Sequence, residues 1–292
     1  MVRWASCNEM FEGWDIASQF GCLASLGYQG VEIAPFTMAA RASEISSARR
    51  REVRTEAARL GLTVTGLHWL LAGPAAEIEG WHLTDPDAGV RAKTVAYIGE
   101  LASLCADLGG GVLVLGSPRQ RSTTGGLSVA ESTKLLVSSL AVALPAVAAA
   151  GVTLCLEPLP AAETDVINSC NESLAVIREL DHPNLRLVLD VKSLAAESRV
   201  SGESIPDIVR RVGRSVEYLQ ANDENRGHPG SGLVDFVPIM AALKAIDYDG
   251  WISIEPFDFR PGPETIARES IAYLKESWAT AEASEGAVHG TT

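Results

Sequence analysis

The chain has 292 residues, of which 47% are hydrophobic and 21% are charged, so it can bury a large core and is not globally disordered. Its 24 basic and 37 acidic residues give a formal net charge of −13, which disfavours general binding to nucleic acid or to anionic membrane surfaces. The length is ordinary for one α/β barrel and does not require a second domain.

The cellular setting is indicated by the N-terminal residues, the cysteines and the apolar runs. No long apolar stretch precedes Glu9, so we expect no signal peptide. The five cysteines are odd in number, lack the CxxC spacing of zinc sites and mostly sit in apolar runs, which is typical of buried free thiols in a reducing compartment. The longest apolar run, residues 140–152, contains Pro145 and is too short to span a bilayer. We therefore expect a cytoplasmic protein with no membrane partner.

One pattern recurs in chain order: a short β-rich run that ends at a polar residue, then a loop, then an amphipathic helix. Most strand candidates are apolar on both faces, as are the strands of a parallel sheet covered on both sides. We predict strands at residues 3–8, 30–35, 63–69, 112–116, 152–157, 185–190, 216–221 and 250–255.

The helices between these strands carry start and stop signals. Asp85 is the expected N-cap of the third helix, with Pro86 at its first position, and glycines follow the first four helices. Pro145 should kink or interrupt the fourth helix. We predict helices at residues 16–26, 46–60, 86–108, 128–150, 171–180, 205–212, 236–246 and 263–278.

Eight strand–helix units of about 35 residues each predict a single (β/α)8 TIM barrel. No Gly-x-Gly-x-x-Gly follows the first strand, so a doubly wound dinucleotide-binding sheet is not supported. We assign the barrel to residues 1–278. Residues 279–292 are small and polar without periodicity, and we predict a flexible C-terminal tail there.

Three carboxylates end predicted strands: Glu157 on the fifth, Asp190 on the sixth and Glu255 on the eighth. The C-terminal ends of barrel strands form the active site, so these groups should converge. Buried carboxylates that converge raise one another's pKa values, and a divalent cation removes that conflict. Gln220 ends the seventh strand and can supply a fourth oxygen. Oxygen ligands favour Mn²⁺, Mg²⁺ or Co²⁺, whereas the alternative is that each carboxylate pairs with a local Arg or Lys.

The sequence resembles the sugar phosphate isomerase/epimerase family, the xylose isomerase-like barrels that include ketose 3-epimerases and inosose dehydratase. The similarity extends from Asn8 to about Trp278. The motifs that carry it are Gly30-Val-Glu-Ile-Ala-Pro35, Gly66-Leu-His-Trp69, Leu156-Glu-Pro-Leu159, Leu189-Asp-Val-Lys192, Ala221-Asn-Asp223 with Pro229-Gly-Ser-Gly232, and Tyr248-Asp-Gly-Trp-Ile-Ser-Ile-Glu255.

The resemblance implies that Glu157, Asp190, Gln220 and Glu255 hold the metal ion. The family's epimerases have His where this chain has Gln220, and a second His where it has Ser193. Gln at position 220 resembles the dehydratase branch of the family, which includes 3-dehydroshikimate dehydratase. Endonuclease IV, another relative, needs a His-rich three-metal cluster, and this chain has only five His.

The expected chemistry is enolisation of a keto-sugar or keto-polyol. The metal would bind a carbonyl and an adjacent hydroxyl and stabilise the enediolate. Glu157 would act as general base, and Glu255 would return a proton or assist the loss of a hydroxyl. Proton return gives isomerisation or epimerisation, and hydroxyl loss gives dehydration.

Five further residues are candidates for substrate binding. His68 could donate to a substrate oxygen, with Glu32 as its partner, or could be a core His. Lys192 could stabilise the enediolate or pair with Glu157. Arg226 lies in a loop where relatives present an Arg to substrate, or could be a solvated loop Arg. Trp69, like Trp14 and Trp81, is a candidate wall for a sugar face, or could pack in the core.

We predict a divalent-metal-dependent sugar isomerase or epimerase. The alternatives are a lyase that dehydrates a keto-polyol or eliminates from a keto-glycoside, and a non-catalytic sugar-binding barrel. No phosphate-binding signature is evident, which favours an unphosphorylated small-molecule substrate. Many members of the family form dimers or tetramers, so a homo-oligomer is possible.

Overall fold

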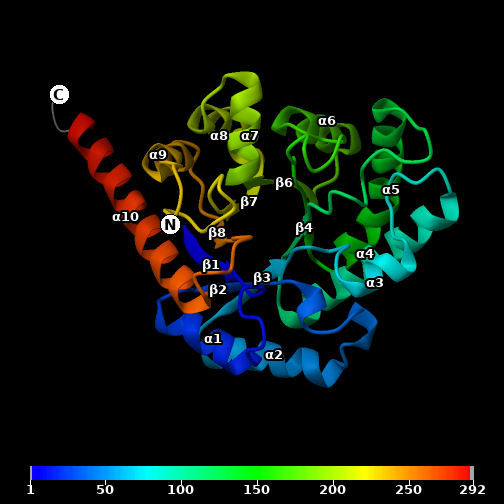
Figure 1. Ribbon diagram of the computed structural model, residues 1–292, viewed down its shortest axis with the longest axis horizontal. Coiled ribbons are helices and arrows are strands. Elements are labelled where there is room, and N and C mark those ends of the chain that lie inside the picture. The colour runs from blue at the N-terminus through cyan, green and yellow to red at the C-terminus, as the bar shows by residue number, and fades with distance from the viewer. Residues whose placement is uncertain (1, 290–292) are drawn as a thin grey trace.

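The computed structural model describes residues 2–289, and it describes side chains as far as residue 284. Within this part of the chain, parallel strands close into one barrel in sequence order, from β1 round to β8 (Figure 1). The strands are β1 (Arg3–Cys7), β2 (Gly30–Ile33), β3 (Thr63–Leu67), β4 (Val112–Leu115), β5 (Thr153–Leu156), β6 (Leu185–Asp190), β7 (Val216–Ala221) and β8 (Trp251–Ile254). The predicted (β/α)8 barrel and all its strands are confirmed.

The helices surround the barrel and cover its outer face (Figure 1). They are α1 (Ile16–Ser25), α2 (Ser47–Arg59), α3 (Pro74–Glu79), α4 (Ala88–Leu108), α5 (Val129–Ala149), α6 (Cys170–Leu180), α7 (Val191–Ser201), α8 (Ile205–Val212), α9 (Phe236–Ala245) and α10 (Pro263–His289), with short 3₁₀ turns η1 (Pro35–Thr37), η2 (Ala42–Glu44) and η3 (Gly213–Ser215).

The short strands stay extended because both of their faces are buried. Every residue of β2, β4 and β8 is buried, as the two-sided apolar composition indicated. One face packs against the helices in a large outer core. The other fills the barrel interior with a small cluster, which comprises Ala5, Val112, Val114, Cys155, Val188, Tyr218 and Trp251.

Backbone hydrogen bonds between neighbouring strands continue one residue past β5 and β8. They fix the direction in which the side chain of that residue points. The amide of Glu157 donates to the carbonyl of Leu115 at 3.2 Å, and that of Glu255 donates to Ala221 at 3.0 Å. Side chains alternate along a strand, so the residue that follows each outward-facing apolar residue points into the barrel mouth. The polar strand ends are therefore presented at one end of the barrel.

Helix α4 begins later than predicted, because the turn before it uses the aspartates differently. Asp85 accepts a hydrogen bond from the amide of Asp87 at 2.8 Å, which makes a tight turn around Pro86. Asp87 is then the N-cap and accepts from the amide of Gly89 at 2.7 Å. The predicted N-cap at Asp85 is wrong by two residues.

Helix α10 does not end at Trp278 as predicted but continues to His289, so the predicted helix end is wrong, whereas the flexibility of the segment from residue 279 stays a prediction. Ala and Glu dominate this segment and favour a helix despite its small, polar composition. Ala281 is buried against the core, and Lys244 of α9 pairs with Glu282 at 3.3 Å. Residues 290–292 of the predicted tail lie outside the described residues.

Helix α5 passes through Pro145 without interruption. It is the one helix within the described part of the chain that is long and apolar enough to cross a membrane by length and composition alone. Here it packs beside α4 in the outer ring of the barrel (Figure 1). The five cysteines are all free, and all but Cys22 are fully buried.

Candidate active site

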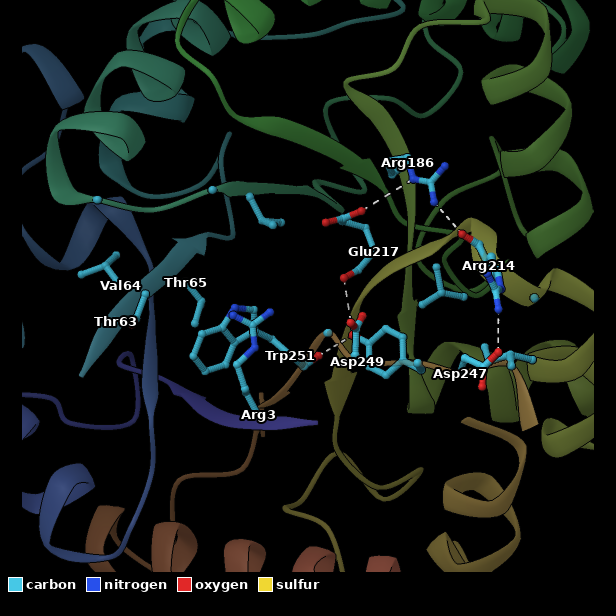
Figure 2. Close-up of a pocket in the computed structure, with 18 residues that line it drawn as sticks. Arg3, Thr63, Val64, Thr65, Arg186, Arg214, Glu217, Asp247, Asp249 and Trp251 are labelled. Carbon is cyan, nitrogen blue, oxygen red and sulfur yellow. Dashed lines mark hydrogen bonds and ion pairs between the residues drawn. The ribbon is translucent and has the colours of Figure 1, made fainter. Parts of the chain in front are cut away.

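Cavities open at both ends of the barrel, and their linings differ in chemistry. A cavity of about 620 Å³ lies at the N-terminal ends of the strands (Figure 2). Its charged side chains are largely paired, with Arg186 at 3.6 Å from Glu217 and Arg214 at 2.6 Å from Asp247. A smaller cavity of about 310 Å³ lies at the C-terminal ends, where TIM barrels carry their active sites.

Glu157 and Glu255 both line this C-terminal cavity and are buried. Burial and the nearby charge of Asp190 raise the pKa of Glu157 to about 8. The same two causes, with the charge of Glu157 added, raise the pKa of Glu255 well above its ordinary value. The sequence prediction that these groups converge is consistent with their mutual effects on pKa.

Gly116 at the end of β4 makes room for the carboxylate of Glu157. A β-carbon placed on Gly116 would lie 2.3 Å from Oε2 of Glu157, closer than any real contact. Any other residue would therefore push the carboxylate out of its present position. The Gly that ends Val-Leu-Val-Leu on β4 is thus required by the position of Glu157 on the neighbouring strand.

Asp190 is the last residue of β6 and also the N-cap of α7, which starts directly after it. Its Oδ1 accepts the amide of Ser193 at 2.8 Å, and its Oδ2 accepts the side chain of Asn222 at 2.5 Å. The Asn222 amide group also donates to the carbonyl of Glu255 at 3.2 Å. Asn222 therefore ties the end of β6 to the end of β8 beneath the cavity.

Gln220 lies next to Asp190 in the barrel register and is fully buried. Its Nε2 donates to Oε1 of Glu32 at 3.0 Å, which fixes the amide orientation. Its Oε1 has no hydrogen-bond partner within the described residues. A buried amide oxygen without a donor is costly, and a cation is one way to satisfy it.

The predicted ligand set therefore fits a divalent ion by its chemistry. It combines an orphaned amide oxygen with three carboxylates, two of which have raised pKa values, and a 2+ charge would stabilise their ionised forms. Oxygen-only ligands of this kind suit Mn²⁺, Mg²⁺ or Co²⁺.

A second cluster with metal-ligand chemistry lies beside this set. One ligand atom each from Cys7, Glu9 and His68 lies within 4.8 Å of the others. Burial and the charges of Glu9 and Glu255 hold the pKa of the Cys7 thiol well above its ordinary value, so the thiol is neutral. A bound metal ion would deprotonate the thiol, so the donor types decide between the two sets: the mixed sulfur, oxygen and nitrogen donors of this cluster suit a softer ion than the oxygen-only set does.

His68 is buried and held by carboxylates rather than by backbone groups. Its Nε2 lies 2.7 Å from Glu9 and 3.9 Å from Glu255, and its Nδ1 lies 3.7 Å from Glu32. Burial lowers the pKa of His68, but the charges of Glu9 and Glu32 outweigh it and raise the pKa. Glu32, predicted as the partner of His68, lies 3.7 Å from its Nδ1 as an ion-pair partner and also accepts a hydrogen bond from Gln220.

Lys192 lies in the first turn of α7 and lines the cavity. Its Nζ pairs with Glu163 at 2.6 Å, so its closest acid is not Glu157 as one alternative suggested. Nζ also sits 4.8 Å from the ring centre of Phe257, and the guanidinium of Arg226 lies 4.9 Å from the same ring. Phe257 thus positions two cations at the cavity wall.

Three residues of the lining adopt left-handed backbone conformations that are uncommon outside glycine. These are Trp69 at φ 50° and Ser117 at φ 43°, each two residues past its strand, and Arg226 at φ 68° in the loop after β7. Such conformations gather at functional sites, where the surrounding structure enforces them. The carbonyl of Arg226 accepts two amides, from Phe257 and Asp258 at 2.9 and 3.0 Å, which holds its loop in place.

Of the tryptophans considered as sugar walls, Trp69 lines the cavity but Trp81 does not. Trp81 is buried and stacks on Tyr97 with ring centres 3.7 Å apart, so it belongs to the core. Of the two alternatives for Trp81, core packing therefore holds and the wall prediction is wrong.

Two site residues were missed by the sequence prediction: Arg121 and Glu163. Glu163 and Arg121 lie in loops whose course the sequence does not reveal. Arg121 is fully buried, and burial lowers its pKa to about 10 while the charges of Glu157 and Glu163 oppose that change.

The comparisons with known proteins agree with this architecture. D-psicose 3-epimerase of Ruminiclostridium cellulolyticum is 29% identical over 239 residues, 80% of this chain and 76% of its own. L-ribulose 3-epimerase of Mesorhizobium japonicum is 30% identical over 211 residues, 68% of this chain and 65% of its own. 3-Dehydro-D-guloside 4-epimerase of Escherichia coli is 23% identical over 274 residues, 92% of this chain and 97% of its own.

Solved structures show the same fold. The D-psicose 3-epimerase of Clostridium cellulolyticum H10, solved with D-tagatose, superposes with a TM-score of 0.81 at 24% identity, and the match covers 96% of this chain and 99% of that chain. These named relatives confirm the prediction of an isomerase or epimerase enzyme. The family model for the xylose isomerase-like TIM barrel matches residues 20–277. The chain therefore belongs to the xylose isomerase-like TIM barrel family.

Proposed function

We propose that this protein is a divalent-metal-dependent epimerase of a keto-sugar, which works by removing and returning a proton beside the carbonyl. The observation that carries the proposal is the set of buried oxygens at the C-terminal end of the barrel. Glu157 and Glu255 line one cavity, and Asp190 and the orphaned oxygen of Gln220 lie next to each other on β6 and β7.

Glu157, Asp190, Gln220 and Glu255 would hold the ion, with Mn²⁺ as a suitable choice. When bound, the ion would polarise the carbonyl and the adjacent hydroxyl of the sugar and so acidify the neighbouring C–H. Asn222 contributes by bonding Asp190 and the backbone of Glu255, which keeps the two strand ends together. Residues that orient metal ligands in this way support both affinity and activity.

Glu157 is the proposed general base and Glu255 the proposed proton donor. Both are buried beside the cavity, and their raised pKa values reflect the same desolvated, acidic surroundings. A carboxylate in such surroundings is a stronger base than one in water. Returning the proton to the opposite face of the enolised carbon inverts its configuration, which is epimerisation.

The remaining lining residues are suited to bind sugar hydroxyls. Arg226 makes no ion pair or side-chain hydrogen bond within the described residues, so its guanidinium donors are available. Lys192 and Glu163 form a pair at 2.6 Å that can donate to and accept from the same substrate. His68 reaches Glu9 and Glu255, which places it beside the proposed proton donor.

The test is solvent deuterium exchange into D-fructose, D-psicose, L-ribulose and a 3-keto-glucoside, followed by proton NMR. We expect exchange at one carbon beside the carbonyl with Mn²⁺ and none after chelation. Glu157→Gln and Glu255→Gln should each slow exchange by about 10²–10⁴-fold. No exchange with any of the four sugars and any added divalent metal would contradict the proposal.

Product analysis separates epimerisation from dehydration. The named relatives are epimerases, which favours a product with the same mass as the substrate. Gln220 in place of the usual His is the feature that favours dehydration. A conjugated enone that absorbs in the ultraviolet would identify a lyase instead.

A further inference from the structure

A second cavity of about 630 Å³ lies against the proposed active site and shares part of its wall. Trp69, Arg226 and Phe257 line both cavities. The rings of Trp69 and Phe257 meet edge to face with centres 6.5 Å apart, so they form the boundary between the two spaces. The two cavities are therefore adjacent, with these two rings between them.

The outer cavity is lined by more aromatic rings than the inner one. These are Phe11, Trp14, Phe36, Trp69, Phe257 and Phe259. All except Phe11 are half-buried, so their faces are accessible to a ligand. Gly73 leaves room for Phe36, because an added β-carbon would lie 2.6 Å from the Phe36 side chain. Trp14 packs edge to face on Phe11 with centres 5.4 Å apart.

Charged side chains that can still form hydrogen bonds lie among these rings. Glu12 is exposed and makes no hydrogen bond or ion pair within the described residues, and it lines the outer cavity. Arg226 contributes a guanidinium at the boundary. Aromatic faces combined with separate charged donors and acceptors match a sugar ring, which has apolar C–H faces and a rim of hydroxyls. A purely hydrocarbon ligand would leave the charged groups without partners.

We propose that the outer cavity is a binding subsite for a second sugar ring, so that the substrate is a keto-sugar glycosidically linked to another sugar. This inference rests on the proposed function, because it places the reacting keto ring in the inner cavity. The inner cavity has about half the volume of the outer one, so the outer space holds at least one more ring of similar size. The linkage between the rings would cross the wall that the two cavities share, beside the contact between Trp69 and Phe257.

The kinetic test compares a 3-keto-glucose, its methyl glycoside and keto-disaccharides of both anomeric linkages in the deuterium-exchange assay. We expect one disaccharide to have a KM about tenfold lower than the methyl glycoside. Trp14→Ala and Phe36→Ala should remove that advantage and leave the KM of the methyl glycoside unchanged. Trp278→Ala is the matched control, because Trp278 is also half-buried but lies outside the cavity.

Equilibrium binding of sugars that do not react tests the subsite even if the protein turns over none of the keto-sugars. Methyl glucoside, phenyl glucoside, maltose and cellobiose would be titrated by calorimetry into the wild type and Trp14→Ala. Tighter binding of a disaccharide, lost in Trp14→Ala, supports the subsite even if no sugar exchanges its proton. Exchange of the monosaccharide with no gain for any disaccharide overturns the subsite but not the proposed function. The subsite is also overturned if phenyl glucoside alone binds more tightly than methyl glucoside, or if no disaccharide binds.

Discussion

Replacing Glu157 by Gln should make the metal-free protein more stable at alkaline pH, and the expected size follows from the site. Burial and Asp190 raise the pKa of Glu157 from 4.5 to about 8. Between these values the folded state keeps a proton that the unfolded state has lost, so stability falls as the pH rises. The fall is about 1.4 kcal/mol per pH unit.

From pH 5 to pH 8 this single group therefore lowers the free energy of unfolding by about 4 kcal/mol. Gln cannot ionise and lacks this contribution, so the variant should match the wild type at pH 5 and exceed it by about 4 kcal/mol at pH 8. The raised pKa values of Glu255 and His68 act in the same direction, and Glu157→Gln also removes the part of each shift that the charge of Glu157 causes.

The assay is urea unfolding at pH 5 and pH 8 in the presence of a chelator. Glu52→Gln is the control, because Glu52 is exposed on α2 and should not change the pH dependence. Adding Mn²⁺ at pH 8 should stabilise the wild type, by about 2.7 kcal/mol at 100 times its Kd, and should stabilise Glu157→Gln far less. Parallel pH profiles for wild type and Glu157→Gln would refute this description of the site.

The other predictions concern the metal ligands and the space around them. Gly116→Ala should lower exchange activity at least tenfold, because the new methyl group displaces the Glu157 carboxylate. The variant should still unfold cooperatively. Unchanged activity would show that the reaction does not depend on the present position of this carboxylate. Gln220→Met should weaken Mn²⁺ binding, measured by calorimetry, whereas Gln220→His should retain it; equal affinities in all three proteins would exclude Gln220 as a ligand. Mn²⁺ affinity should rise with pH between 6 and 8, by about tenfold per unit for each proton released; a flat profile would mean that the carboxylates are already ionised without metal.

The strands were predictable because their signals are local. Each strand is a short run that is apolar on both faces and ends in a polar residue, and the closed barrel follows from eight such runs. The strand-end residues Glu157, Asp190, Gln220 and Glu255 were identified for the same reason, since strand ends of one barrel face one mouth. Their role as metal ligands stays a prediction.

Loop-borne partners were not predictable, because the loops bring together residues from distant parts of the chain. Glu9 and His68 are 59 positions apart, and Lys192 and Glu163 are 29 apart. Neither pair has a characteristic spacing. Helix α7 was missed because β6 runs into it at Asp190 with no loop between them. The Glu that binds Lys192 could only be recognised once the course of the loop after β5 was known.

The most direct test of the central claim is an anomalous difference map from crystals soaked in Mn²⁺. The account predicts one peak at the C-terminal end of the barrel, about 2.0–2.2 Å from oxygens of Glu157, Asp190, Gln220 and Glu255. An absent peak, or a peak only between Cys7, Glu9 and His68, would contradict it.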